Sequence, residues 1–237
     1  MKAIIFDKDG TLMAFDPFWA VVADAALSKL SLRLGVLQYQ NTMKESVGLF
    51  GNVTKKNSII QKGTYEQAAE AINGVLKDVG SPVKLSGREI EAIFLESAIY
   101  GVICPTCEGI PELMKRLREH GFLLFLVTTD TPAITYRCLD GLEITGYFHE
   151  IITDDGKFAP KPDPSAIHYL LKKYRLQQDE ICMVGDTDTD MCFAKNGGIM
   201  GIRVGGSSPF ISGEDILIPD VSYLEKALSR VISPRND

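Results

Sequence analysis

The sequence predicts an α/β protein, a Rossmann-like doubly wound parallel sheet with an all-helical cap domain inserted after its first strand. From about residue 104 onward, short apolar runs alternate with helical stretches, which is the pattern of βαβ units. One further apolar run, residues 2–6, stands alone at the N-terminus, and the block that follows it has helical spacing throughout. We therefore expect an α/β core domain of residues 1–14 and 104–237, and a helical cap domain of residues 15–103.

The first strand is expected over residues 2–6, a compact apolar run closed by turn residues. In the inserted block, residues 17–35, 64–80 and 87–100 carry apolar side chains at helical spacing. Ser86 is the expected N-cap of the last of these helices, and Glu89, three residues on, completes a capping box.

Strands and helices then alternate to the end of the chain. Residues 122–130 form a continuous apolar run ending in polar residues, as expected of a central strand buried on both faces. The other expected strands are residues 148–153, 180–186, 199–206 and 215–219, and the expected helices are residues 110–121, 131–142, 163–176, 187–198 and 221–232.

Composition excludes several classes of function. The chain has 237 residues, 45% of them hydrophobic, and a formal net charge of −6, so it lacks the basic surface that nucleic acids need. No apolar run approaches the roughly 18 residues that span a bilayer. The five cysteines are consistent with free thiols in a reducing compartment, and we expect a cytoplasmic protein.

Four groups of polar residues follow expected strands or enter a helix. Because the carboxyl ends of parallel strands meet at one edge of a sheet, these groups are expected to converge there. They are Asp7 and Asp9; Thr128, Thr129 and Asp130; Lys161; and Asp186, Asp188 and Asp190.

Clustered carboxylates repel one another unless a cation neutralises them, and an oxygen-rich site of this kind suits Mg²⁺. One carboxylate can then attack phosphorus to form an aspartyl-phosphate, while a lysine offsets the charge of the phosphoryl oxygens. A second carboxylate can protonate the leaving alcohol and later take a proton from water.

The segments "DKDGTL", "LVTTDTP", "KPDP" and "VGDTDTDM", in this order, resemble the four motifs of the haloacid dehalogenase (HAD) superfamily. The resemblance covers essentially the whole chain, and the helical insertion is similar to that of phosphoglycolate-phosphatase-like members. It implies a Mg²⁺-dependent phosphatase that acts on a small phosphorylated metabolite.

Carried over by motif, the resemblance makes Asp7 the nucleophile and Asp9 the general acid/base, which also offers its backbone carbonyl to the metal. Thr129 matches the phosphate-binding hydroxyl, with Thr128 as the alternative, and Lys161 matches the phosphate-binding lysine. Asp186 and Asp190 match the acids of the last motif, so the implied metal set is Asp7, Asp9, Asp186 and Asp190. Asp130 stands where the family often has Asn, so we expect its backbone amide to contact phosphate and its side chain to point away.

Two other functions stay open. A phosphomutase would share the Asp7 and Asp9 chemistry, and a regulatory protein could keep the phosphate pocket without catalysis. Asp9 itself argues against a dehalogenase, because that class lacks an acid at this position.

Some features have simpler interpretations. Cys104 and Cys107 form an isolated CxxC, which lacks the second pair that a zinc ribbon needs. Lys55 and Lys56 are interpreted as a solvated face of the cap, with contact to an anionic leaving group as the alternative hypothesis. Hinges for cap closure are expected near residues 14–17 and 100–108.

Overall fold

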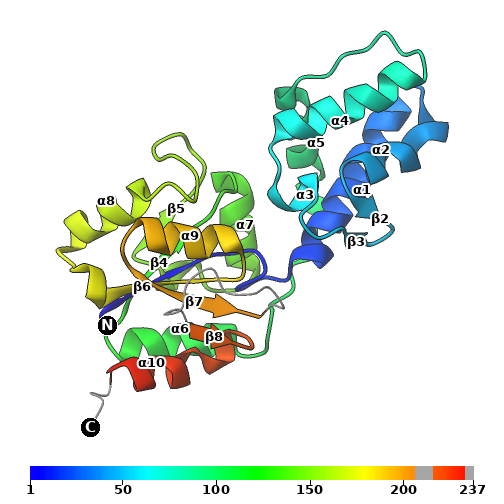
Figure 1. Ribbon diagram of the computed structural model, residues 1–237. Helices are drawn as coiled ribbons and strands as arrows, with labels where there is room; N and C mark the ends of the chain where they lie inside the picture. The colour runs from blue at the N-terminus through cyan, green and yellow to red at the C-terminus, as the bar shows by residue number, and fades with distance from the viewer. Residues whose placement is uncertain (206–215, 233–237) are drawn as a thin grey trace. The chain divides into compact units, whose positions relative to one another are not determined.

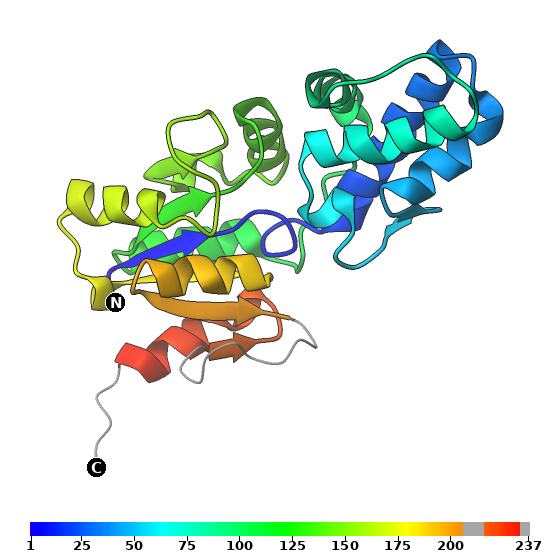
Figure 2. The ribbon, with the colours of Figure 1, turned by 45° about the horizontal axis from the view of Figure 1, so that its top comes forward.

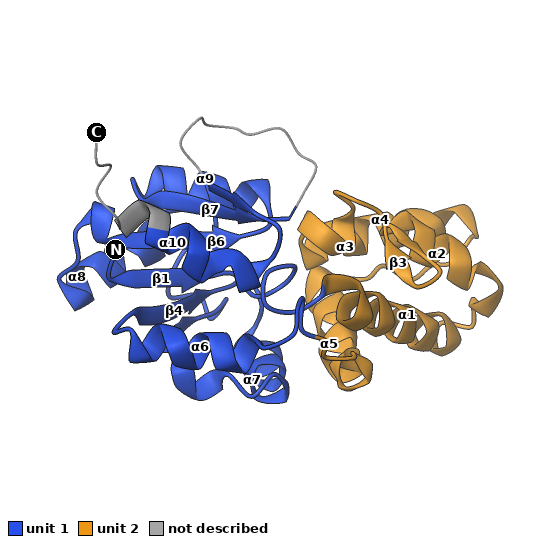
Figure 3. Ribbon diagram, turned by 90° about the horizontal axis from the view of Figure 1, so that it is seen from below, with its two compact units in different colours: residues 1–14, 105–237 blue, residues 15–104 orange. Residues whose placement is uncertain are grey.

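The computed structural model describes residues 1–205 and 216–232, so the end of the expected 199–206 strand and the first residue of the 215–219 strand lie outside it. The chain divides into two compact units (Figure 3). Unit 1 comprises Met1–Ala14 and Pro105–Asp237, and unit 2 comprises Phe15–Cys104.

Unit 1 is built on a parallel sheet (Figures 1 and 2). Among the described residues, six strands pair in parallel in the order β5-β4-β1-β6-β7-β8. The order reverses beside β1, because the chain first adds strands on one side of β1 and then on the other. The strands are β1 (Ala3–Phe6), β4 (Leu123–Val127), β5 (Glu150–Ile152), β6 (Ile181–Gly185), β7 (Met200–Val204) and β8 (Ile216–Ile218).

Strand β1 lies in the middle of the sheet because its whole sequence is apolar. All four residues are buried, and both neighbouring strands pair with them, Phe6 aligning with Leu126 of β4 and with Val184 of β6. A strand covered on both faces needs apolar side chains on both, so the sequence shows a continuous apolar run instead of alternation.

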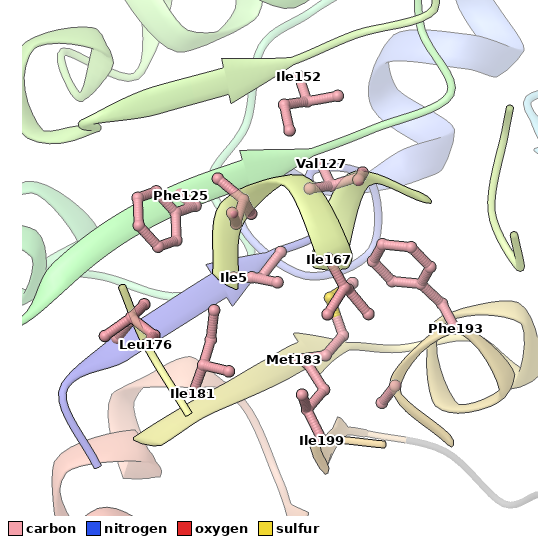
Figure 4. Packing of buried hydrophobic residues seen from close by; sticks show 14 residues of the cluster. Ile5, Phe125, Val127, Ile152, Ile167, Leu176, Ile181, Met183, Phe193 and Ile199 are labelled. Carbon is pink, nitrogen blue, oxygen red and sulfur yellow. The ribbon is translucent and has the colours of Figure 1, made fainter. Parts of the chain in front are cut away.

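One face of the sheet packs against α8 (Ser165–Tyr174) and α9 (Asp188–Asn196). Figure 4 shows the cluster, in which Ile5, Phe125 and Met183 of the strands lie with Ile167 of α8 and Phe193 of α9. These helices place the residues at their N-terminal ends beside the carboxyl ends of the strands.

The other helices of unit 1 are α6 (Ile110–Glu119), α7 (Pro132–Gly141) and α10 (Leu224–Ile232). Helices α6 and α10 lie side by side (Figure 1), and an ion pair of 2.9 Å between Arg116 and Glu225 joins them. The 3₁₀ turns of this unit are Thr145–Tyr147, Gln178–Glu180 and Val221–Tyr223.

Unit 2 consists mainly of helices that bury their apolar faces against one another. The predicted capping box is confirmed, since the Ser86 side chain accepts a hydrogen bond from the Glu89 amide and Glu89 binds the Ser86 amide in return. The helices are α1 (Phe15–Arg33), α2 (Gln40–Ser46), α3 (Ile59–Lys62), α4 (Tyr65–Asp78) and α5 (Gly87–Ser97), with 3₁₀ turns at Leu37–Tyr39 and Ala98–Tyr100.

Unit 2 also departs from the expected all-helical composition. Strands β2 (Leu49–Phe50) and β3 (Val53–Thr54) form a short antiparallel hairpin across Gly51, whose φ is +60°. A Gly-Asn pair between apolar residues is a hairpin signal. Strands of two residues are too short to produce a visible alternation, so periodicity alone missed them.

Within the described residues, none of the helices combines the length and the apolar character that crossing a membrane requires.

Candidate active site

The loop after β1 carries the first two site residues. The Asp7 amide still donates to the Val184 carbonyl at 2.9 Å, so Asp7 continues the line of the strand before the chain turns. Gly10 has a φ of +80°, and a Cβ built there would lie 2.3 Å from Oδ2 of Asp186. The turn therefore requires glycine both for its backbone conformation and for the close approach of Asp186.

Three carboxylates from two neighbouring strand ends meet beside this loop. Asp7 follows β1, Asp186 follows β6, and Asp190 lies in the first turn of α9; one oxygen of each lies within 4.8 Å of the others. The site lies beside β1, where the strand order reverses, which is where open parallel sheets bind ligands.

Lys161 brings a positive charge into this cluster. Its ammonium donates to Oδ1 of Asp7 and to Oδ1 of Asp190, each at 2.6 Å, and its side chain is only 5% exposed. Burial lowers the pKa of Lys161, but Asp190 and Asp7 outweigh that effect and raise it overall, so the lysine stays charged.

A capping box holds Asp190 in place. The Asp190 amide donates to Oγ1 of Thr187 at 3.2 Å, and the Thr187 amide donates to Oδ2 of Asp190 at 3.1 Å. A Cβ on Gly185 would lie 2.5 Å from the Asp190 side chain, so the last residue of β6 must be small to admit it. The side chain that binds Lys161 is therefore positioned by the start of α9.

Burial makes the negative charge of this cluster unfavourable. Desolvation, opposed mainly by Lys161, raises the pKa of Asp7 from 3.8 to about 7. Desolvation and the neighbouring carboxylates of Asp7 and Asp190 raise the pKa of Asp186 to about 8. Three carboxylates facing a single ammonium leave excess negative charge, and a hard divalent cation would offset it. The donor set therefore fits Mg²⁺, with Asp7, Asp186 and Asp190 as the residues that would hold it.

Asp9 points to a different partner. Its carboxylate lies 2.7 Å from the Lys8 ammonium and is not among the three carboxylates that lie within 4.8 Å of one another. Burial raises the pKa of Asp9 to about 6, although Lys8 opposes the shift. A carboxyl group of that pKa can both release and accept a proton near neutral pH.

The sequence reasoning missed Lys8. Its side chain is fully buried, and its ammonium also lies 2.8 Å from Oδ2 of Asp130. If the alternation of the strand continues past Phe6, Lys8 points to the same side as residues 4 and 6, which are buried. This alternation is the sequence signal that could have predicted a buried Lys8. Asp130 consequently directs its carboxylate to Lys8.

The two candidate threonines after β4 differ in exposure. Thr128 is buried; its amide donates to the Ile152 carbonyl at 3.0 Å and its hydroxyl accepts from the Asp130 amide at 3.3 Å. Thr129 is exposed. Both residues line a small cavity to which Lys161 also contributes.

The remaining candidates lie outside the acidic cluster. Asp188 accepts a hydrogen bond of 2.6 Å from the buried Arg203 of β7. Cys104 and Cys107 are free thiols. Lys55 and Lys56 are exposed in unit 2 between β3 and α3.

Comparison with known proteins gives one family. The family model described as haloacid dehalogenase-like hydrolase matches residues 1–198. Phosphoglycolate phosphatase from Vibrio vulnificus (strain CMCP6) is 28% identical over 236 residues, which cover 98% of this chain and 95% of the relative.

Solved structures share the fold. A HAD phosphatase from Thermococcus onnurineus superposes with a TM-score of 0.65 at 24% identity, covering 96% of this chain and 98% of that one. A predicted phosphoglycolate phosphatase from Haemophilus somnus 129pt gives a TM-score of 0.69 at 20% identity, with coverage of 96% and 98%.

Proposed function

This chain belongs to the haloacid dehalogenase-like hydrolase family, and from that premise we propose that it is a Mg²⁺-dependent phosphatase acting on a small phosphorylated metabolite. The observation that carries the proposal is the position of the Asp7 carboxylate, which lies at a strand end within 4.8 Å of two other acids and 2.6 Å from the Lys161 ammonium. The free cysteines support a reducing, cytoplasmic setting.

Asp7 is the proposed nucleophile. One of its carboxylate oxygens attacks the phosphorus atom, the bond from phosphorus to the ester oxygen breaks, and an aspartyl-phosphate forms. Lys161 holds the carboxylate through a hydrogen bond of 2.6 Å, and its charge offsets the charge that spreads over the phosphoryl oxygens. A hydroxyl of Thr128 or Thr129 would help to fix the phosphoryl group.

Asp9 is the proposed general acid and base. In the first displacement its carboxyl group gives a proton to the departing alkoxide. In the second, its carboxylate takes a proton from the water that attacks phosphorus, the bond to Asp7 breaks, and inorganic phosphate leaves.

Asp7, Asp186, Asp190 and the backbone carbonyl of Asp9 would hold Mg²⁺. When bound, the ion supplies positive charge beside the phosphoryl oxygens and relieves the repulsion among the buried carboxylates. Phosphoglycolate is the first substrate to test, because relatives that match nearly the whole chain bear the name phosphoglycolate phosphatase.

The test is a panel of phosphate esters assayed for release of inorganic phosphate, with Mg²⁺ and with excess chelator. We expect phosphate release only with Mg²⁺, and we expect Asp7→Asn to lower kcat by about a thousandfold or more, because the amide is a poor nucleophile. Isomer formation without net phosphate release would favour a mutase. Absence of turnover on every ester would favour a non-catalytic binding protein.

A further inference from the structure

Lys8 is a buried charged residue that takes no part in the reaction proposed above. None of its surface is exposed, and its ammonium lies 2.7 Å from Oδ2 of Asp9 and 2.8 Å from Oδ2 of Asp130. Burying an ammonium is strongly unfavourable unless anionic partners surround it, and an apolar side chain would fill the same interior space without that penalty. The charge at this position therefore calls for an explanation beyond packing.

The three residues come from the ends of two neighbouring strands. Lys8 and Asp9 follow β1, and Asp130 follows β4, which pairs with β1 in parallel. Because its single ammonium lies between the two carboxylates, Lys8 fixes the position of the loop after β1 relative to the loop after β4. The side chains of Asp9 and Asp130 are only 15% and 13% exposed, so water screens their mutual repulsion weakly.

We propose that Lys8 and Asp130 are positioning residues that hold the Asp9 carboxylate in place for proton transfer, Lys8 by ion pairing and Asp130 by anchoring the other side of Lys8. The role rests on the proposed phosphatase activity.

This arrangement has a kinetic consequence. Lys8 is fully buried, so its loss should leave substrate binding nearly unchanged. Lys8→Met keeps an unbranched side chain of similar length but leaves Asp9 and Asp130 as facing, uncompensated carboxylates. The carboxylates would move apart, and Asp9 would lose the orientation that proton transfer needs. Replacing Asp130 by Asn at the same time removes the repulsion.

The experiment is a double-mutant cycle with Lys8→Met, Asp130→Asn and the double variant, measured as kcat and KM on the best ester with Mg²⁺. We expect Lys8→Met to lower kcat by about tenfold or more while KM stays within about threefold. In the Asp130→Asn background Lys8 has already lost its anchor, so the same substitution should lower kcat by less than about threefold.

Lys44→Met is the matched control. Lys44 is a buried lysine in α2 that pairs, among the described residues, with one carboxylate, that of Asp24, at 2.6 Å. We expect kcat of this variant to stay within about twofold of wild type, since loss of the Lys44 ammonium affects stability alone.

Several results would overturn the proposal. One is a kcat of Lys8→Met equal to that of wild type, and another is an effect confined to KM. A third is a tenfold loss of kcat when Lys8→Met is added to the Asp130→Asn variant. This comparison can be made even if the Lys8→Met single variant fails to fold. A wild type without phosphatase activity would overturn the proposed function and this role with it, whereas an active wild type with an unaffected Lys8→Met variant would overturn this role alone.

Discussion

Among single residues, Asp7 lies in a buried cluster in which the carboxylates outnumber the ammonium groups. Lys161 lies within hydrogen-bonding distance of Asp7 and Asp190, whereas Asp186 forms no ion pair with any described residue and has a pKa raised to about 8. The cluster therefore carries more negative charge than one lysine offsets. Its electrostatics favour either protonation or a bound divalent cation.

The pH dependence of stability follows from these pKa values. The carboxyl groups have a pKa near 3.8 when unperturbed, and folding raises the pKa of Asp7 to about 7 and that of Asp186 to about 8. The metal-free folded state then binds more protons than the unfolded state, so its stability falls as pH rises from about 4 to about 8.

Mg²⁺ should reverse this loss. At a hundred times its dissociation constant the ion adds about 2.7 kcal/mol, which raises Tm by about 5–11 °C for a chain of this size. We expect that gain at pH 8 and a smaller gain at pH 5.5, where protons compete for the same carboxylates. Thermal unfolding with and without Mg²⁺ at both pH values measures it. An equal or larger gain at pH 5.5 would contradict this electrostatic picture.

A pair of variants serves as the control for that measurement. Asp186→Asn should remove most of the gain, because it removes one of the proposed ligands. Asp188→Asn should keep it, because the Asp188 carboxylate binds Arg203 instead.

At the level of single residues, the motifs predicted which side chains would lie close together. The structure brings Asp7, Asp186, Asp190 and Lys161 together, as expected of residues at neighbouring strand ends. The sequence did not predict which partner each of these side chains contacts. The pairing of Asp130 with Lys8 depends on two loops meeting, and no local pattern encodes the distance between them.

Among the elements, helix α9 does the most to shape the site, because its first turn holds Asp190. The Thr187 capping box satisfies two backbone amides at the start of the helix and fixes the carboxylate that binds Lys161. A comparable box, Thr64 with Gln67, caps α4 in unit 2 and contributes nothing to the acidic cluster.

The two caps give a matched prediction. Thr187→Ala and Thr64→Ala should each cost about 1 kcal/mol of stability, because each removes one N-cap hydrogen bond. Only Thr187→Ala should also weaken Mg²⁺ binding, by about tenfold, since it frees Asp190 to move. Titration calorimetry with Mg²⁺ separates the two effects. Equal Mg²⁺ affinity in both variants would show that the cap does not position the ligand.

The sequence predicted the long elements well, and the reason is physical. Strands β1, β4 and β6 are buried on both faces and therefore appear as continuous apolar runs, while the capping box at Ser86 has a local signature. The hairpin of β2 and β3 was missed, since strands of two residues leave hardly any periodic signal.

For the whole molecule, the division into two compact units allows each unit to move as a separate body. The chain passes from one unit to the other at Ala14–Phe15 and at Cys104–Pro105, close to the hinges expected from the sequence. We expect the chain to become more compact when substrate binds, a change that we call closure.

Small-angle scattering tests this closure. With Mg²⁺ and vanadate as an inert phosphate analogue, we expect a smaller radius of gyration than with Mg²⁺ alone. Asp7→Asn with the same additions is the control for binding at the site. Identical scattering of the wild type in both states would contradict closure.

The measurement that tests the central claim most directly is chemical trapping of the phosphorylated residue. Borohydride reduces an acyl phosphate to an alcohol but leaves a free carboxylate intact, so quenching during turnover and peptide mass spectrometry identify the residue that carried the phosphoryl group. We expect homoserine at position 7, in amounts that depend on substrate and Mg²⁺. Homoserine at another aspartate, or none at all in an enzyme that is turning over, would contradict the account.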